Sequence, residues 1–144
     1  MLNVFEVHEI DGEVEAAVPG LVRQLSQSAP APTREQLEAL VNHPAITFLA
    51  ARVDDGPIIG ILTLALFPVP TGLRAWIEDV VVDGAAQRQG AGRALTIAAI
   101  DLARAAGART VDLTSRPSRE GANRLYQGLG FERRETNVYR YDLG

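Results

Sequence analysis

The chain of 144 residues has the length of a single domain, and a hydrophobic content of 47% is enough for one sizeable core. Its net charge of −4 argues against nucleic-acid binding, and no apolar stretch approaches the roughly 20 residues that a membrane-spanning helix needs. The lack of cysteine excludes a disulfide scaffold and a thiolate nucleophile. We predict one cytoplasmic domain over residues 1–144, with no nucleic-acid or membrane partner.

The two histidines do not predict a metal site. His8 and His43 lie far apart in the sequence, and neither belongs to an H-E-x-x-H arrangement. We therefore expect no metal ion.

The first elements are a strand and two helices. Residues 3–9 are typical of a strand, and Asp11 is a suitable cap for the helix that follows, in which apolar residues recur at helical spacing up to Leu25. Pro19 is expected to break or kink this helix. A capping box begins a second, shorter helix at Thr33, after a loop.

Three strands follow. Residues 45–53 and 58–67 are rich in β-forming residues and flank a turn of Asp and Gly, which predicts a hairpin. Residues 74–83 are apolar enough for a central strand, yet this run contains two adjacent acids, Glu78 and Asp79. Strand alternation predicts that these two side chains point to opposite faces of the sheet.

The remaining chain is predicted to alternate between helices and strands. Residues 92–106 have the clearest helical period, with a glycine where a C-terminal cap belongs. A strand at 110–115, a helix capped by Ser118, and two short strands from Phe131 onward complete the chain. The predicted order is β-α-α-β-β-β-α-β-α-β-β, an α/β protein.

A loop with two glycines, Gln87-Arg88-Gln89-Gly90-Ala91-Gly92, separates the central strand from the strongest predicted helix. In such a loop the backbone N–H groups converge on an anion at the helix N-terminus, and glycines let phosphate oxygens come close. Arg88 and Arg93 add charged donors. Taken alone, the loop is equally typical of a flexible surface turn. A dinucleotide fingerprint is disfavoured because Leu95 stands where its third glycine belongs.

A second group of residues lies near the C-terminal end. Asn123 and Tyr126 are three positions apart, so they share one face of the last predicted helix, which Leu129-Gly130-Phe131 follows. A tyrosine at such a position is more often part of a core than a catalyst. Its occurrence after the glycine loop, in this order, favours a functional role.

Over nearly its whole length the sequence resembles the GCN5-related N-acetyltransferase (GNAT) superfamily. Gln87-x-x-Gly90-x-Gly92 is similar to the superfamily's pyrophosphate loop, and Asn123-x-x-Tyr126 with Leu129-Gly130-Phe131 is similar to its second signature. The resemblance implies a mixed central β-sheet flanked by helices, whose fourth and fifth strands splay apart to admit the pantetheine arm of acetyl-CoA. Gly84 stands where a proline often follows the central strand, which predicts a looser entrance to the loop.

The resemblance also implies a coenzyme site. The backbone of Val80 and Val82 is expected to bind the acetyl carbonyl and pantetheine, the loop to bind the pyrophosphate, Asn123 to contact the pantetheine or phosphate side, and Tyr126 to face the sulfur. The implied acetyl-CoA-binding residues are Val80, Val81, Val82, Gln87, Arg88, Gln89, Gly90, Ala91, Gly92, Arg93, Asn123 and Tyr126. Acetyl-CoA is the expected acyl donor, and a homodimer is compatible with the resemblance.

The expected reaction transfers an acetyl group to a primary amine of a small molecule or peptide by direct attack in a ternary complex. Tyr126 is the candidate acid, and Glu78 is the candidate base, acting through water. For Glu78, a salt bridge with an arginine is the structural alternative. A catalytically silent acyl-CoA sensor and a pure interaction domain remain as other functions of the whole chain.

The acceptor is expected to bind near the helix pair and neighbouring loops, about Leu25–Thr33, Pro68–Arg74 and Arg133–Tyr139. Four arginines could recognise a carboxylate or phosphate on it, although a solvated surface is the more common role for such residues. These are Arg116, Arg119, Arg133 and Arg134.

Overall fold

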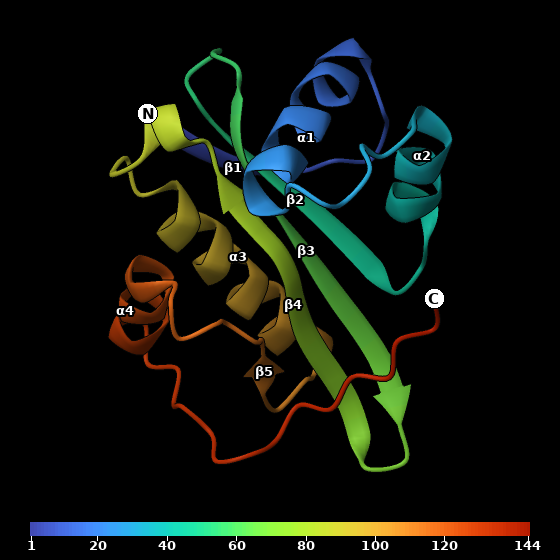
Figure 1. Ribbon diagram of the computed structural model, residues 1–144, viewed down its shortest axis with the longest axis vertical. Helices are drawn as coiled ribbons and strands as arrows, with labels where there is room; N and C mark the ends of the chain where they lie inside the picture. The colour runs from blue at the N-terminus through green and yellow to red at the C-terminus, as the bar shows by residue number, and fades with distance from the viewer. The chain divides into compact units, whose positions relative to one another are not determined.

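The computed structural model describes all residues from 1 to 144, which form two compact units, Met1–Thr114 and Ser115–Gly144. The first unit contains a five-stranded sheet with three α-helices, and the second contains one α-helix (Figure 1). In chain order the elements are β1 (Leu2–Glu6), α1 (Gly12–Leu25), α2 (Arg34–Asn42), β2 (Ile46–Val53), β3 (Ile58–Val69), β4 (Gly72–Val82), a 3₁₀ turn (Gly84–Ala86), α3 (Ala91–Ala106), β5 (Val111–Asp112) and α4 (Glu120–Gly128).

The sheet of the first unit is mixed, with the strand order β1-β2-β3-β4-β5. Strands β1 to β4 form consecutive antiparallel pairs, and β5 lies parallel to β4. The β4–β5 pairing is limited to Ala75 with Val111 and Trp76 with Asp112. Beyond Trp76, β4 continues to Val82 beside β3 only. This confirms the predicted fold class, including the splay of the fourth and fifth strands.

Helices cover both faces of this sheet. Phe48, Ala50 and Ile61 belong to one hydrophobic cluster with buried residues of α1 and α2. Because side chains alternate along a strand, Leu62 points to the opposite face, where α3 packs. A Cβ atom on Gly60 would lie 3.1 Å from Leu95 Cδ1, so the glycine lets α3 approach the sheet closely. Apolar packing therefore holds strand β3 on both faces of the sheet.

The helix pair has the expected caps. Asp11 caps α1, and Thr33 forms a capping box with Gln36 at the start of α2. Arg34 joins the two helices, since its guanidinium donates to the carbonyl of Ile10 and to Glu15, each at 2.6 Å. The expected break at Pro19 does not occur: α1 continues through the proline, because its apolar face is buried on both sides of that residue.

The C-terminal elements differ from the prediction. Strand β5 contains two residues rather than the six expected, and α4 begins at Glu120 without a side-chain cap, so Ser118 is not its cap. The two short strands expected after Phe131 are not formed. The apolar side chains in that stretch stay exposed, at 74% for Val138 and 93% for Leu143. β-forming side chains therefore do not produce a strand here, because no burial accompanies them.

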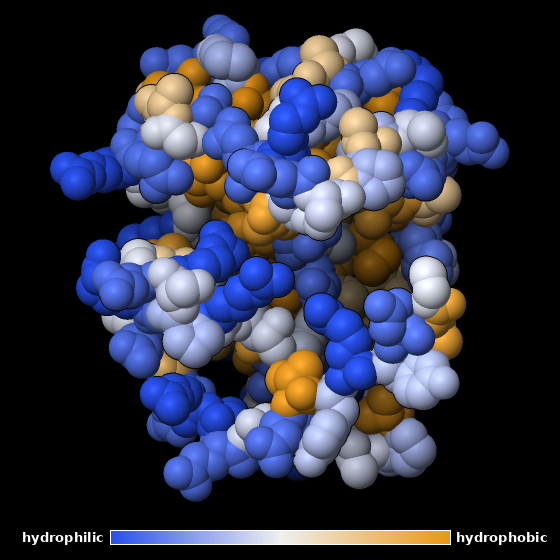
Figure 2. Space-filling view, viewed as in Figure 1, coloured by the Kyte–Doolittle hydropathy of each residue, from blue (hydrophilic) through white to orange (hydrophobic).

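In the view of Figure 2, hydrophilic side chains project outward and apolar ones lie mainly deeper between them. None of the helices combines the length and the hydropathy that crossing a membrane requires.

Candidate active site

Strand β4 carries a β-bulge next to the two acids. Ile61 pairs with Val81 and Thr63 with Glu78, so both Asp79 and Val80 lie opposite the single residue Leu62. The backbone of Asp79 has φ +50°, a left-handed conformation that aspartate tolerates better than most residues. Both acids are exposed. The bulge interrupts strict alternation between Asp79 and Val80, and the expectation that Glu78 and Asp79 point to opposite faces stays a prediction.

The carboxylate of Glu78 is held by a neighbour on the same strand. Trp76 Nε1 donates to Glu78 Oε1 at 2.7 Å, as two residues two positions apart on one face of a strand can do. No arginine forms a salt bridge with Glu78, so the structural alternative considered for this residue is not found. An exposed carboxylate with one oriented oxygen remains, next to the point at which β4 leaves β5.

The end of β4 is not paired with β5. Val81 belongs to the hydrophobic cluster with α1, so its side chain is part of the core. The backbone of Val80 and Val82 follows the last β5-paired residue, Trp76, by several positions. The carbonyl of Val82 accepts a hydrogen bond from Gln87 Nε2 at 3.2 Å. Gln87 thus connects the end of the strand with the glycine loop.

The glycine loop has the backbone conformation of an anion site. Arg88 and Gly90 both have left-handed φ values, +69° and +83°. Gly90 is the N-cap of α3 and provides no side-chain cap, so the first-turn N–H groups of a 16-residue helix lack a side-chain acceptor. Those groups and the helix dipole favour a bound anion.

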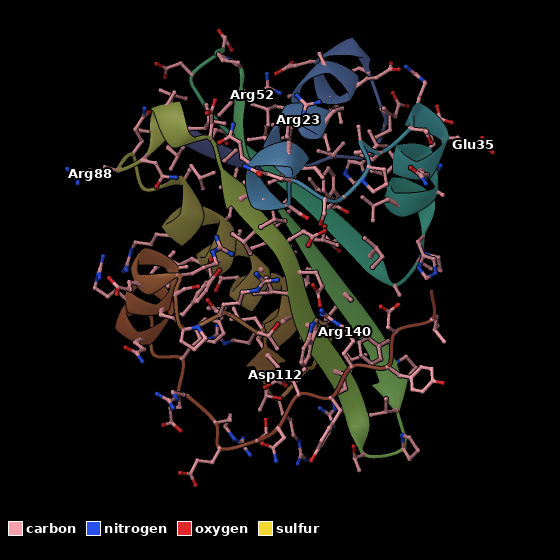
Figure 3. The ribbon with its side chains drawn as sticks, in the orientation of Figure 1. Arg23, Glu35, Arg52, Arg88, Asp112 and Arg140 are labelled. Atoms are coloured by element: carbon pink, nitrogen blue, oxygen red, sulfur yellow. The ribbon has the colours of Figure 1, made fainter.

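Two arginines flank the uncapped turn. Arg88 and Arg93 are exposed and take part in no salt bridge of the chain. Figure 3 shows the Arg88 side chain pointing away from the loop into solvent. Both charges are therefore available to a phosphate.

Asn123 and Tyr126 lie on α4 in the second unit. Asn123 Nδ2 donates to the carbonyls of Arg116 and Arg119, at 2.9 and 2.8 Å, and so holds the segment that precedes the helix. The ring of Tyr126 packs edge-on against Phe131, with 5.7 Å between centroids. Burial raises the pKa of the Tyr126 phenol, while the charge of Arg119 opposes this effect. The phenol is thus protonated at neutral pH.

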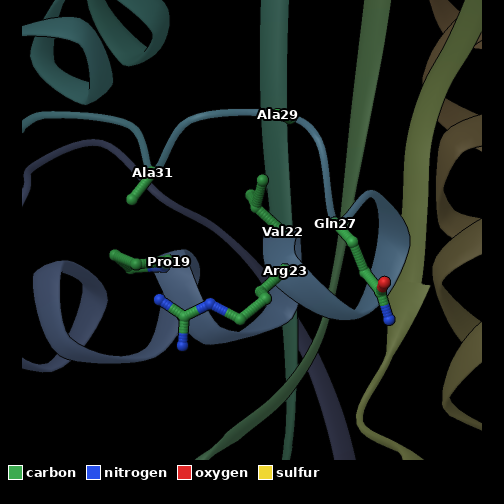
Figure 4. A pocket seen from close by; sticks show the side chains of 6 residues that line it. All are labelled: Pro19, Val22, Arg23, Gln27, Ala29 and Ala31. Carbon is green, nitrogen blue, oxygen red and sulfur yellow. The ribbon is translucent and has the colours of Figure 1, made fainter.

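A pocket of about 350 Å³ opens between α1 and the loop that follows it (Figure 4). The loop passes over the second half of α1, and both contribute to the wall. The lining residues are Pro19, Val22, Arg23, Gln27, Ala29 and Ala31. Three of them fall in the predicted acceptor region, Leu25–Thr33. The α1 residues were missed because the sequence does not reveal where the loop folds back.

Trp76 was also missed as a neighbour of the site. Its spacing of two from Glu78 on a predicted strand was a usable signal.

The chain has no cluster of three or more His, Cys, Asp or Glu side chains suited to holding a metal ion.

Known structures resemble this fold. A putative acetyltransferase from Agrobacterium tumefaciens str. C58 superposes with a TM-score of 0.82 at 22% identity, over 97% of this chain and 99% of that one. The aminoglycoside acetyltransferase meta-AAC0020, from an uncultured soil metagenomic sample, gives 0.85 at 23% identity, over 98% and 95%. A ribosomal-protein-alanine N-acetyltransferase from Brucella melitensis biovar Abortus 2308 gives 0.78 at 21% identity, over 100% of both chains.

At these identities the structural likeness establishes the fold, and family membership rests on the sequence. No curated protein matches the chain at a significant level. The family model described as Acetyltransferase (GNAT) family matches residues 15–131, which is most of the chain and includes both signatures. The chain belongs to the GNAT acetyltransferase family.

Proposed function

We propose that the chain is an acetyl-CoA-dependent N-acetyltransferase, one domain over residues 1–144, that acetylates a primary amine of a small molecule or peptide. The observation that carries this proposal is the uncapped N-terminus of α3, which begins at a left-handed Gly90 between the unpaired Arg88 and Arg93. The family model spans both units of the chain, which supports treating them as one functional domain.

Acetyl-CoA binding would use mainly backbone groups. The pyrophosphate would accept hydrogen bonds from the first turn of α3, with charge supplied by Arg88 and Arg93. The pantetheine arm would pair with the β4 edge at Val80 and Val82, where β5 no longer accompanies the strand. Asn123 Oδ1 would remain free to accept from the coenzyme, because the Asn123 hydrogen bonds within the chain use Nδ2.

Direct attack in a ternary complex fits the residues available. The chain has no cysteine to carry the acetyl group as a thioester. An ammonium has no lone pair, so the acceptor must lose a proton before its nitrogen attacks the thioester carbonyl. Glu78 would take this proton, directly or through water. A C–N bond forms, the C–S bond breaks, the electron pair leaves with the sulfur, and the nitrogen releases its second proton to solvent as the amide forms.

Tyr126 would assist the leaving sulfur. Its raised pKa keeps the phenol protonated, so the hydroxyl is able to donate to the thiolate as charge develops there. A thiol like that of cysteine has a pKa of about 8.5, well below that of this phenol, so complete proton transfer is uphill. A strong hydrogen bond to sulfur is therefore the larger part of the proposed role.

The acceptor would lie between Glu78 and the pocket of α1. Two of the similar structures are named for an acceptor class, an aminoglycoside and a ribosomal-protein alanine, and both classes offer amino groups. The carboxylate of Glu78 and the indole beside it suit a cationic amine. Arg23 and Gln27 in the pocket offer hydrogen bonds to the remainder of the acceptor.

The proposal is tested in two steps. Thermal unfolding with acetyl-CoA or NAD should show stabilisation by acetyl-CoA alone, of about 2.7 kcal/mol at 100 times the dissociation constant. A panel of amines monitored by thiol release then separates an enzyme from a silent sensor. Stabilisation without turnover on amino sugars, polyamines, amino acids or peptides would favour the sensor. An unchanged melting curve would contradict coenzyme binding itself.

A further inference from the structure

The last turn of α1 is tied to the entrance of the glycine loop. Gln24 Oε1 accepts a hydrogen bond from the backbone N–H of Gly84 at 2.8 Å, and Gln24 Nε2 donates to Asp83 Oδ1 at 3.3 Å. Asp83 Oδ1 also accepts from the N–H of Ala85 at 3.1 Å. One side chain, about 60 positions earlier in the sequence, thus holds the residues that lead from β4 into the loop.

This contact gives the backbone of Gly84 a role that a proline at this position lacks. A glycine in place of proline predicts a looser loop entrance, but here the N–H of Gly84 is a hydrogen-bond donor, which a proline lacks. Gly84 does not have a positive φ, and a Cβ atom there would lie 3.6 Å from Gln24 Oε1, an ordinary contact. Neither strain nor close packing requires glycine at this position. The property that matters is therefore its backbone N–H, which donates to Gln24.

Gln24 is not needed to hold α1 itself. The helix is anchored on the sheet by Val14, Val18 and Leu21, each at most 4% exposed. Gln24 is two residues beyond Val22 and one beyond Arg23, both of which line the pocket. The hydrogen bonds therefore join the part of α1 that lines the pocket to the part of the chain that leads into the glycine loop.

We infer that Gln24 is a positioning residue for the coenzyme loop: it fixes the Asp83–Ala85 segment before acetyl-CoA binds. The inference rests on the proposed function, in which the loop holds the pyrophosphate. A loop that is already ordered loses less conformational freedom on binding, so affinity rises without any new contact to the ligand. Gln24 itself would not touch the coenzyme.

The test measures acetyl-CoA binding by isothermal titration calorimetry. Gln24→Leu keeps most of the side-chain volume and removes both hydrogen bonds, and we expect the Kd to rise about fivefold, the size of one or two exposed hydrogen bonds. Amide hydrogen exchange without coenzyme should become faster at Gly84 and Ala85 in this variant. An unchanged Kd would overturn the inference.

A rescue experiment separates positioning from a general loss of stability. Asp83 has ψ 129°, a value outside the α region that suits a residue before proline. In Gln24→Leu, adding Gly84→Pro should bring the Kd back to within about twofold of the parent, because the ring fixes φ where the hydrogen bond did. Adding Gly84→Ala instead, the matched control, should not.

The outcomes distinguish this inference from the function on which it rests. If the parent protein does not bind acetyl-CoA, the proposed function fails and the inference fails with it. If the parent binds and the proline double variant binds no better than the alanine one, only the positioning role is wrong.

Discussion

The proposed coenzyme side and the proposed acceptor side of the first unit are built in different ways. The coenzyme side is one continuous segment, from the edge of β4 through Gly90 into α3, and it offers mainly backbone N–H and C=O groups. The acceptor side combines side chains from separate elements, such as Glu78 on β4 and Arg23 on α1. Because backbone groups do the binding on the coenzyme side, many side-chain substitutions there should leave binding intact. On the acceptor side each substitution changes a group that contacts the acceptor. Substitutions should therefore separate the two sides cleanly.

The largest effect is expected at Gly90. Gly90→Asp places a carboxylate at the proposed pyrophosphate site, in a backbone with φ +83°, and should abolish measurable acetyl-CoA binding in calorimetry. Gly90→Asn tolerates the same backbone without a charge, so it should weaken binding much less. Gly12→Asp, at the open first position of α1, adds the same charge elsewhere and should leave Kd unchanged. Equal binding by the parent and Gly90→Asp would place the pyrophosphate elsewhere.

The next effect belongs to the acceptor side. Glu78→Gln should lower kcat by about 100-fold, the lower end of the range for a general base, and most strongly at pH values where the acceptor is mainly protonated. Acetyl-CoA affinity should stay nearly intact. Asp79→Asn removes the adjacent exposed acid and serves as the control, with little expected loss of kcat. A large loss of kcat in Asp79→Asn with little loss in Glu78→Gln would instead identify Asp79 as the base.

Tyr126→Phe should lower kcat by at least about tenfold when chemistry limits turnover, because only the hydroxyl is lost. The ring still packs against Phe131, so acetyl-CoA affinity should change little. Steady-state kinetics and calorimetry on the same preparations check both parts. Equal losses of affinity and kcat would instead indicate a packing role.

The smallest effect is expected at Trp76. Trp76→Phe removes the N–H that holds Glu78 Oε1, and kcat should fall about threefold to tenfold, in line with one ordinary hydrogen bond at an exposed site. In a Glu78→Gln background the same substitution should cost clearly less, because its partner is already changed. Additive losses in this double-mutant cycle would mean that Trp76 acts independently of Glu78.

Local patterns allowed the sequence to predict where two of the helices begin. The capping box at Thr33 and the helix that follows Gly90 depend on residues a few positions apart, and both are found as predicted. The family resemblance supplied the splay of β4 and β5. The acetyl-CoA-binding and catalytic roles of the residues stay predictions.

Features that depend on distant residues could not be predicted. The bulge at Asp79 is visible only when β4 is paired with β3, and the hydrogen bond from Gly84 requires Gln24, which lies far away in the sequence. The missing strands after Phe131 are the opposite case, since strands were predicted from the local sequence and the apolar side chains there remain exposed.

The most direct test of the account is an NMR titration of the amide-labelled protein with acetyl-CoA. We predict that the largest amide shifts occur at Gly90, Gly92 and Arg93, with further shifts at Val80 and Val82 on the β4 edge. The amides of β2 (Ile46–Val53), which lies away from β5 in the strand order, should change little. Binding that leaves the first turn of α3 unperturbed would contradict the central claim that this uncapped turn holds the pyrophosphate.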